Sequence, residues 1–269
     1  VSWGGPPPPP PPAGPPPPRR PGPPPPPPPR ATTPHPRGGR GARDGYPEVW
    51  GAPEAAAAAA GRPIENVIFD FGNVLIYWDP AAVLVPRYSE RTVEQFLDND
   101  ISGFYDANDM MDGGVSHEEA IAWMRRTHGD EWADILEYYV ANFRDSLVGV
   151  VPGARVLVND LKAAGVGVWG LSNWERELYP IAEECCPILQ QLDGKVVSGY
   201  VRLRKPHRDI YEYALREFGI DPSTAVFIDD KAMNIVGANA AGIRGVRFSD
   251  PRRLRELLIE AGVNIPAVA

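Results

Sequence analysis

Two short apolar runs, each followed at once by acidic residues, constrain the fold of this chain most strongly. Val67–Phe69 and Ala225–Ile228 are uninterrupted, rich in strand-forming residues and too short to be helices. We expect two buried parallel strands, with Asp70 at the carboxyl end of the first and Asp229 and Asp230 at the end of the second. Because ligands in open α/β sheets bind beyond these strand ends, the three carboxylates should meet in one crevice.

From about residue 63 onward, short apolar strands alternate with amphipathic helices, which predicts an α/β fold with a Rossmann-like, doubly wound parallel sheet. The expected strands are Asn66–Phe71, Gly167–Leu171, Ala225–Ile228 and Gly245–Phe248. The expected helices are Gly153–Ala164, one beginning near Trp174, Arg208–Phe218, Lys231–Ala241 and Pro251–Ala261. A polar, hairpin-like stretch is expected around Lys195–Leu203.

Residues 80–150 interrupt this alternation with helical periodicity and no convincing strand, over a length too great for a simple crossover. Ser116 and Glu119 have the spacing of a capping box, which predicts a helix start. Apolar residues then recur at helical spacing over Asp130–Leu147. We interpret residues 80–150 as an inserted α-helical cap domain, with residues 63–79 and 151–269 forming the sheet domain.

Residues 1–62 are predicted to be a disordered, proline-rich arm and linker. Of the 33 prolines in the chain, 21 precede Gly38, and polyproline II geometry has no internal hydrogen bonds from which to build a core. The arm is interpreted either as a ligand for a proline-recognition module or as a dispensable leader.

The composition excludes several classes of partner. A formal net charge of −8 disfavours nucleic acid as a partner, and no apolar run reaches the roughly 18 residues of a membrane span. The N-terminus lacks an apolar signal core, so we expect a cytoplasmic protein without a membrane partner. Cys185 and Cys186 are adjacent, and a bridge between them would be strained, so no disulfide is expected.

Two other points of the chain carry polar groups suited to chemistry. Ser172 and Asn173 follow a strand and precede the helix expected near Trp174, where a hydroxyl and free amides would face an anion. Lys205 lies in a loop before a helix. Taken alone, Ser172 is better explained as an ordinary helix N-cap, and Lys205 as a solvated surface lysine. The three carboxylates, Asp70, Asp229 and Asp230, make a hard, oxygen-rich site that suits Mg²⁺.

Four short motifs occur in a fixed order along the chain: FDFGNV, LSN, RKP and FIDDKAMN. In this order they resemble the haloacid dehalogenase-like hydrolase superfamily over residues 64–262, including a helical insert that is similar to the C1-type cap. The detailed strings are most similar to a phosphatase subfamily that includes a bacterial α-glucose-1-phosphate phosphatase. The resemblance implies a phosphatase that works through an aspartyl-phosphate.

The resemblance also implies a Mg²⁺ cofactor and a role for each matching residue. Asp70 would attack phosphorus, while Asp70, the Gly72 carbonyl and Asp230 would bind Mg²⁺. Ser172 and the amide of Asn173 would hold the phosphoryl oxygens, and Lys205 would neutralise their charge. Asp229 and Asn234 would orient the metal's waters or Lys205.

One position departs from the wider superfamily. Most of its phosphatases carry a second Asp two residues after the nucleophile, where this chain has Gly72. That Asp acts as general acid and base, a contribution typically worth about 10²–10⁴-fold. Its absence implies a substitute acid, for which Asp79 is a candidate, or an easier leaving group such as a sugar anomeric phosphate.

Substrate contacts are expected from the cap, where the sequence is least informative. Candidates for the mouth of the crevice are Asp79, Phe104, Tyr105, Trp123 and Arg126, although apolar packing explains the aromatic residues equally well. The histidines have no metal-ligand spacing and are expected on the surface: His117, His128 and His207.

These observations favour a Mg²⁺-dependent phosphatase that acts on a small phosphorylated metabolite, with a sugar phosphate as one candidate. A 2-haloacid dehalogenase is the first alternative, because that reaction also uses an Asp nucleophile without the second Asp, although it has no use for the acid pair. A non-catalytic relative that binds a phosphometabolite or a protein is another. A receiver-like signalling domain fits less well, because its acid pair precedes the phosphorylated Asp.

Overall fold

The computed structural model describes residues 49–50 and 61–267 of the chain. Two predictions concern residues 1–62: that they are disordered and that they bind a proline-recognition module. Apart from 49–50 and 61–62, these residues lie outside the described part of the chain. At 49–50 the structure has a short strand, β1 (Val49–Trp50), which the sequence analysis did not predict. It pairs antiparallel with β8 (Arg244–Arg247), with Val49 opposite Val246.

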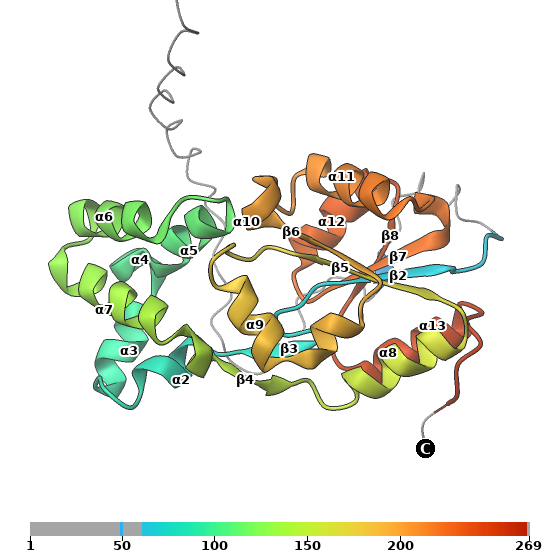
Figure 1. Ribbon diagram of the computed structural model, residues 1–269, viewed down its shortest axis with the longest axis horizontal. Coiled ribbons are helices and arrows are strands. Elements are labelled where there is room, and N and C mark those ends of the chain that lie inside the picture. Colours follow the sequence, from blue (N-terminus) through green and yellow to red (C-terminus); the bar gives the residue numbers. More distant parts are fainter. Residues whose placement is uncertain (1–48, 51–60, 268–269) are drawn as a thin grey trace, which may run out of the picture. The chain divides into compact units, whose positions relative to one another are not determined.

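A six-stranded sheet forms the centre of the fold, in the order β1-β8-β7-β2-β5-β6 (Figure 1). From β8 to β6 all neighbours run parallel. The remaining strands of this sheet are β2 (Asn66–Phe69), β5 (Gly167–Ser172), β6 (Gly194–Val197) and β7 (Ala225–Asp229). β2 thus lies between two strands that are distant in sequence, and the predicted doubly wound α/β architecture is confirmed.

Helices cover both faces of this sheet (Figure 1). Ile68 and Phe227 pack into one hydrophobic cluster with residues of α11 and α12, whereas Val67 and Phe69 belong to another with residues of α8 and α13. Each of the last three residues of β2 is at most 1% exposed, as expected for a strand buried on both faces. The flanking helices are α8 (Ala154–Ala163), α9 (Tyr179–Cys185), α10 (Ser198–Val201), α11 (Arg208–Phe218), α12 (Ala232–Ala240) and α13 (Pro251–Glu260).

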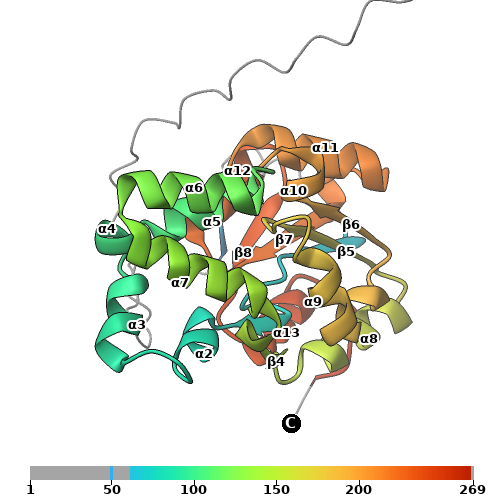
Figure 2. The same ribbon diagram turned by 60° about the vertical axis from the view of Figure 1, so that its left-hand side comes forward.

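A group of helices between residues 80 and 141 forms the second part of the structure, which Figure 2 brings forward. Its members, called the helical group below, are α2 (Pro80–Leu84), α3 (Glu90–Phe96), α4 (Asn99–Ser102), α5 (Phe104–Asp112), α6 (His117–Thr127) and α7 (Asp130–Ala141). Aromatic rings form its core: the Phe104 centroid lies 4.8 Å from that of Phe96 and 5.2 Å from that of Tyr139. The capping box of Ser116 and Glu119 is confirmed at the start of α6.

A two-stranded antiparallel ribbon joins the helical group to the sheet. It consists of β3 (Ile76–Trp78) and β4 (Leu147–Val150). Trp78 Nε1 donates a hydrogen bond to the Tyr139 hydroxyl at 2.9 Å, which fixes α7 to this ribbon. No strand was expected within residues 80–150, so β4 corrects that expectation. β4 was missed because its four residues include Gly149 and show no alternation of buried and exposed positions.

Two local predictions on the carboxyl side of β5 are also wrong. The helix expected near Trp174 begins only at Tyr179, because Glu175 Oε2 accepts hydrogen bonds from the backbone N of Glu177 (2.8 Å) and of Leu178 (2.6 Å) and holds a turn instead. The stretch expected to resemble a hairpin around Lys195–Leu203 is a parallel strand, β6, followed by α10.

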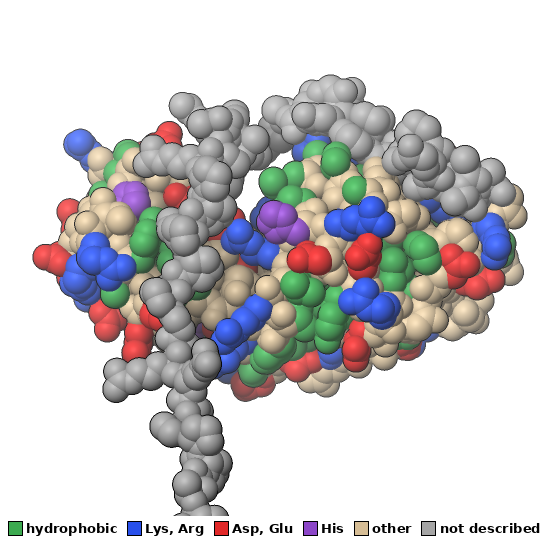
Figure 3. Space-filling view, turned by 90° about the horizontal axis from the view of Figure 1, so that it is seen from above, with side chains coloured by type: hydrophobic (Ala, Val, Ile, Leu, Met, Phe, Trp, Pro, Cys, Tyr) green, Lys and Arg blue, Asp and Glu red, His purple; other side chains and the backbone are tan. Residues whose placement is uncertain are grey.

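Two sequence-based expectations concern surfaces and thiols. Cys185 and Cys186 are both free, as predicted. Among the described residues, none of the helices combines the length and the apolar character needed to cross a lipid bilayer. On the face shown in Figure 3, Lys and Arg side chains are interspersed with Asp and Glu side chains over the described surface.

Candidate active site

Asp70 follows β2 directly and lies at the carboxyl end of the parallel sheet. Its backbone N donates to Ile228 O at 2.9 Å, which extends the pairing with β7. Asp70 is 7% exposed, and its Oδ1 accepts hydrogen bonds from Phe71 N (2.7 Å), Ser172 Oγ (2.7 Å) and Lys205 Nζ (2.9 Å). None of the described residues donates to Oδ2. One oxygen is therefore fixed and the other is left for chemistry.

Lys205 is buried between two carboxylates and is not a solvated surface lysine. Its Nζ lies 2.9 Å from Asp70 Oδ1 and 2.7 Å from Asp229 Oδ2, and it also donates to Leu171 O at 3.1 Å. Burial lowers the pKa of Lys205, but the two carboxylates outweigh burial and hold this pKa above its ordinary value. The ammonium group is therefore charged and offsets the negative charge around it.

Ser172 and Asn173 lie at the end of β5, beside Asp70. The Ser172 hydroxyl donates to Asp70. The Asn173 side chain pairs reciprocally with the Lys205 backbone: Nδ2 donates to Lys205 O and Lys205 N donates to Oδ1, both at 2.9 Å. The prediction that these residues open a helix is wrong, since α9 begins at Tyr179. Asn173 instead fixes the loop that carries Lys205.

Asp229, the last residue of β7, is 0% exposed. Its Oδ1 accepts hydrogen bonds from Lys231 N and Asn234 Nδ2, and its Oδ2 accepts them from Lys205 Nζ and Asn234 Nδ2. Burial raises the pKa of Asp229, an effect that Lys205 opposes. Protein donors thus occupy both oxygens, and Asp229 connects Lys205 to the start of α12.

Asp70, Asp229 and Asp230 form a carboxylate cluster in which one oxygen of each residue lies within 4.8 Å of the others. Burial and the neighbouring Asp70 raise the pKa of Asp230, which is the expected response of like charges crowded in a poorly solvated place. A divalent cation with oxygen ligands would relieve this repulsion. Gly72 lies two residues beyond Asp70, and a Cβ added there would meet no heavy atom within 4 Å.

The residues predicted to contact substrate do not all lie near this cluster. Phe104 is 0% exposed within the helical group, so the prediction that it lines the crevice is wrong; its apolar side chain is part of the aromatic core. Arg126 is exposed, and Trp123 is half-buried against His128, with ring centroids 5.2 Å apart. Within residues 61–267, no hydrogen bond, ion pair or ring contact joins Arg126 or Trp123 to the carboxylate cluster.

Tyr105 and Asp79 are more closely connected to it. Burial raises the pKa of the half-buried Tyr105, while the charge of Lys231, the residue after Asp230, lowers it and that of Asp79 raises it. Asp79 is exposed and caps α2, with Oδ1 accepting a hydrogen bond from Ala81 N at 2.9 Å. The carboxylate proposed as a substitute acid is therefore engaged at a helix start.

His117 corrects the expectation that the histidines are exposed. It is the first residue of α6, its side chain is 17% exposed, and its Nε2 lies 3.1 Å from Oε2 of Glu175, in the turn after β5. Its Nδ1 lies 3.6 Å from Glu177 Oε2. The adjacent Glu175 carboxylate raises the pKa of His117. His117 thus links the helical group to the sheet part, whereas His207 is exposed as predicted.

Two charged residues were not singled out from the sequence: Lys231, which directly follows Asp230, and Asp112, whose charge acts on Lys231. Burial lowers the pKa of Lys231, but the cluster and Asp112 raise this pKa above its ordinary value. Asp112 is the last residue of α5 and is 8% exposed. A signal was present: Phe104, Asn108 and Asp112 follow one another at intervals of four, so a polar pair shares the helix stripe of a core residue.

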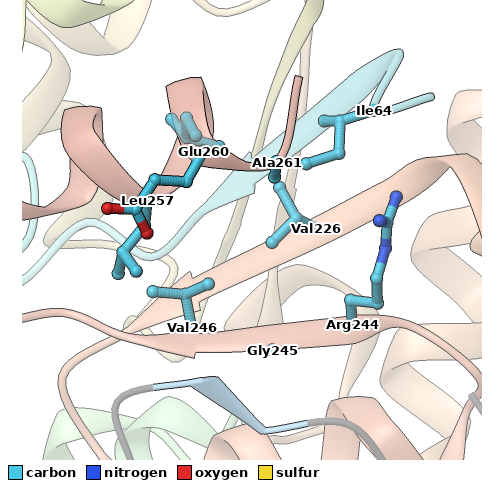
Figure 4. A pocket seen from close by; sticks show the side chains of 9 residues that line it. Ile64, Val226, Arg244, Gly245, Val246, Leu257, Glu260 and Ala261 are labelled. Atoms are coloured by element: carbon cyan, nitrogen blue, oxygen red, sulfur yellow. The ribbon is translucent and has the colours of Figure 1, made fainter. Parts of the chain in front are cut away.

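A cavity of about 300 Å³ lies elsewhere in the molecule (Figure 4). Ile64 precedes β2 and Arg244 opens β8, so the cavity faces the amino ends of the strands, whereas Asp70 lies beyond a carboxyl end. It is therefore separate from the candidate active site. Its lining residues are Ile64, Val226, Arg244, Gly245, Val246, Leu257, Leu258, Glu260 and Ala261.

Known proteins with similar sequences include hydrolases. The sesquiterpene phosphatase astK of Aspergillus oryzae is 25% identical over 185 residues, which cover 68% of this chain and 89% of that protein. The drimenol cyclase drtB of Aspergillus calidoustus is 27% identical over 189 residues, or 69% of this chain, which thus spans about a third (34%) of the cyclase. The (S)-2-haloacid dehalogenase 4A of Burkholderia cepacia is 25% identical over 133 residues, covering 49% of this chain and 57% of the dehalogenase.

The fold and the family agree. A haloacid dehalogenase family enzyme from Bacteroides thetaiotaomicron has a similar fold, with a TM-score of 0.57 at 20% identity, covering 73% of this chain and 98% of that one. The family model of the haloacid dehalogenase-like hydrolases matches residues 64–242, a range that includes the carboxylate cluster, Ser172 and Lys205. The chain therefore belongs to the haloacid dehalogenase-like hydrolases.

Proposed function

We propose that this protein is a Mg²⁺-dependent phosphatase that hydrolyses a small phosphorylated metabolite through an aspartyl-phosphate on Asp70. The observation that carries the proposal is the meeting of Asp70, Asp230 and the buried Lys205 at the carboxyl ends of the central strands. The sesquiterpene phosphatase relative supports it, as does the Bacteroides enzyme crystallised with magnesium and inorganic phosphate. Candidate substrates are a sugar phosphate and, by analogy with that relative, a sesquiterpene phosphate.

The residues present fit Mg²⁺. The carboxylate cluster carries more negative charge than Lys205 balances, and a divalent cation would offset the remainder. We assign Asp70, Asp230 and the Gly72 carbonyl as the groups that would hold the ion. Asp229 and Asn234 would instead orient Lys205, because both Asp229 oxygens are occupied. When bound, Mg²⁺ would polarise the phosphoryl group and offset its charge.

The chain's own residues would carry out two displacements. Asp70 Oδ2 attacks phosphorus while Ser172 and Lys205 hold Oδ1, so the nucleophile is oriented before the substrate arrives. The P–O bond to the alcohol breaks and the aspartyl-phosphate forms. Water then attacks phosphorus, which releases phosphate and restores the Asp70 carboxylate. Ser172, the Asn173 amide and Lys205 would stabilise the phosphoryl oxygens during both steps.

We infer that residues 80–150 act as a cap over this site, with residues 63–79 and 151–269 as the core. The ribbon of β3 and β4 supports this division, because the chain enters and leaves the helical group through neighbouring strands. A cap that closes would keep bulk water from the aspartyl-phosphate. Asp79, Tyr105, Trp123 and Arg126 stay candidates for substrate contact. A cytoplasmic location stays our expectation, since free cysteines suit a reducing compartment.

The test is a panel of phosphate monoesters, including sugar phosphates, a sesquiterpenyl phosphate and p-nitrophenyl phosphate, assayed for phosphate release with Mg²⁺ or with EDTA. We expect turnover that requires Mg²⁺ and is abolished by Asp70→Asn. Asp106→Asn is the matched control, because Asp106 is exposed on α5 and its side chain makes no hydrogen bond or ion pair among the described residues. A folded wild-type protein that releases phosphate from no ester would contradict the proposal and favour a non-catalytic phosphometabolite-binding or protein-binding role.

A 2-haloacid dehalogenase is the second candidate. The dehalogenase relative from Burkholderia cepacia and the Gly at position 72 favour it. The carboxylate cluster counts against it, because an Asp that displaces halide from carbon, forming an ester that water then hydrolyses, needs no cation. Chloride release from 2-chloropropionate that persists in EDTA, with no phosphate release from the panel, would establish this alternative.

A further inference from the structure

A phosphatase of the proposed kind needs a proton for the leaving alcohol, and the carboxylate cluster does not supply one. Asp229 is occupied by protein donors, and Asp79 caps a helix. We propose that Asp112, at the end of α5, is the general acid and base of this site. The inference rests on the proposed phosphatase function and deepens it by assigning the role that Gly72 leaves open.

The backbone of Asp112 is anchored beside the end of β5. Ser198 Oγ donates a hydrogen bond to Asp112 O at 2.6 Å, and the same hydroxyl accepts one from Trp174 N at 3.0 Å. Trp174 is two residues beyond Ser172. A single hydroxyl group therefore connects the end of α5 to the loop that carries part of the candidate site.

A second contact joins α5 to the loop that carries Lys205. Arg204 precedes Lys205, and its Nη1 lies 3.3 Å from Oδ2 of Asp109, one turn before Asp112 on α5. α5 and α10 lie next to each other in both views (Figures 1 and 2). The last turn of α5 thus contacts the loop that carries Lys205 directly and the loop after β5 through the Ser198 hydroxyl.

The Asp112 side chain is buried but only partly satisfied. Its Oδ2 accepts a hydrogen bond from Asn108 Nδ2 at 3.1 Å, and no described residue donates to Oδ1. The charges of Asp112 and Lys231 act on each other, and Lys231 follows Asp230 directly. A buried carboxyl group with one hydrogen bond is costly, so its free oxygen is suited to a partner outside the protein. We assign that partner as the leaving oxygen of the substrate.

The protonation of Asp112 suits this role near neutral pH. Burial raises the pKa of Asp112 to about 7. Asp109 and Glu175 add to this effect, whereas Lys231 and Arg204 oppose it. Asp112 also ends a helix, where the dipole disfavours a carboxylate. A group with such a pKa can donate a proton and take one back within a catalytic cycle.

The proposed steps balance. As Asp70 Oδ2 bonds to phosphorus, the electron pair of the breaking P–O bond goes to the alcohol oxygen, which takes the Asp112 proton and leaves as a neutral alcohol. The Asp112 carboxylate then accepts a proton from the water whose oxygen attacks the aspartyl-phosphate. Cleavage of the bond between phosphorus and Asp70 releases hydrogen phosphate and returns both side chains to their starting states.

The experiment compares phenyl phosphate with p-nitrophenyl phosphate in Mg²⁺, using the full chain and Asp112→Asn. Phenolate is the more basic leaving group and needs the proton, whereas p-nitrophenolate departs without it. Because kcat/KM reports the first displacement, we expect it to fall by about 10²–10³-fold for phenyl phosphate and by less than about tenfold for p-nitrophenyl phosphate. The alkaline decline of kcat/KM for phenyl phosphate should also disappear. Asp106→Asn should match the wild type.

Equal losses with the two esters, or rates equal to those of the wild type, would overturn the role of Asp112 and leave the proposed function standing. A wild type without Mg²⁺-dependent turnover of either ester would overturn both.

A rescue variant separates chemistry from folding. A side chain at Gly72 has open space, and its backbone lies outside the left-handed region. Gly72→Asp in the Asp112→Asn background therefore places an acid two residues after the nucleophile. We expect turnover of phenyl phosphate to recover by at least about tenfold. A folded double variant that does not recover would contradict loss of an acid as the cause.

Discussion

Lys205 is the positive charge that lies between two buried carboxylates, so it bears on the stability of this protein and, in the proposed mechanism, on its chemistry. Its exposure is 3%, so water cannot replace it. Removing one partner from a buried ion pair commonly costs about 3–5 kcal/mol, and here two acids would lose their partner together.

We therefore predict that Lys205→Met lowers the free energy of unfolding by about 3–5 kcal/mol and abolishes phosphate release. Urea unfolding at neutral pH measures the first effect. Lys162→Met is the control, since Lys162 pairs with Asp193 at the surface and exposed pairs contribute at most about 1 kcal/mol. A loss for Lys205→Met no larger than that of the control would contradict this account.

Ser172 permits a second prediction, in which rate and stability separate. Its hydroxyl donates to the Asp70 oxygen that stays fixed in the proposed mechanism. Ser172→Ala should lower kcat by about 10²–10³-fold but lower the free energy of unfolding by only about 1 kcal/mol. Steady-state kinetics and urea unfolding of the same preparation check both. Unchanged kcat would exclude a role for the hydroxyl in either displacement.

Among the helices and loops, the ion pair of His117 and Glu175 has consequences that depend on pH. It connects α6 to the turn after β5, and Glu177 faces the same imidazole. The pKa of His117 is raised above its ordinary value of 6.5, so the folded state binds the proton more tightly than the unfolded state. This contribution to stability is fully present below pH 6.5 and is lost as the pH rises through the folded-state pKa.

We predict that the wild type loses thermal stability relative to His117→Gln as the pH rises from about 6 to about 9. The measurement is the unfolding temperature of both proteins across this range in one buffer system. Glu118→Gln, which changes an exposed neighbour on α6, should keep the pH dependence of the wild type. Parallel curves for the wild type and His117→Gln would mean that the ion pair does not act.

The predicted and observed elements differ where side-chain hydrogen bonds or packing between distant segments, and not the apolar pattern of the segment itself, decide the structure. The strands before Asp70 and Asp230 were predicted because their uninterrupted apolar residues indicate burial on both faces. The helix expected near Trp174 was wrong because Glu175 bonds to the local backbone instead. The surroundings of Asp112 depend on how α5 packs against α10, and this packing is set by residues far apart in the sequence.

For the whole molecule, binding of a cation to the folded state is linked to the free energy of unfolding. If Mg²⁺ binds the folded chain through Asp70 and Asp230, it raises the free energy of unfolding by about 2.7 kcal/mol at a concentration a hundred times its Kd. We predict a rise in the unfolding temperature with Mg²⁺ that EDTA reverses and that is lost in Asp230→Asn. Glu260→Gln, in an exposed residue of α13, should retain it. An equal rise in the unfolding temperature of Asp230→Asn would show that the ion binds at another site.

The pairing of β3 with β4 has a consequence for how such a molecule can change. Ile76 lies opposite Val150, so the chain leaves the sheet part and returns to it side by side. The segment between these strands is therefore attached to the sheet part through one two-stranded ribbon. Replacing this segment with a different one would leave the register of the large sheet unchanged, so the same sheet residues could be combined with helices that admit different substrates.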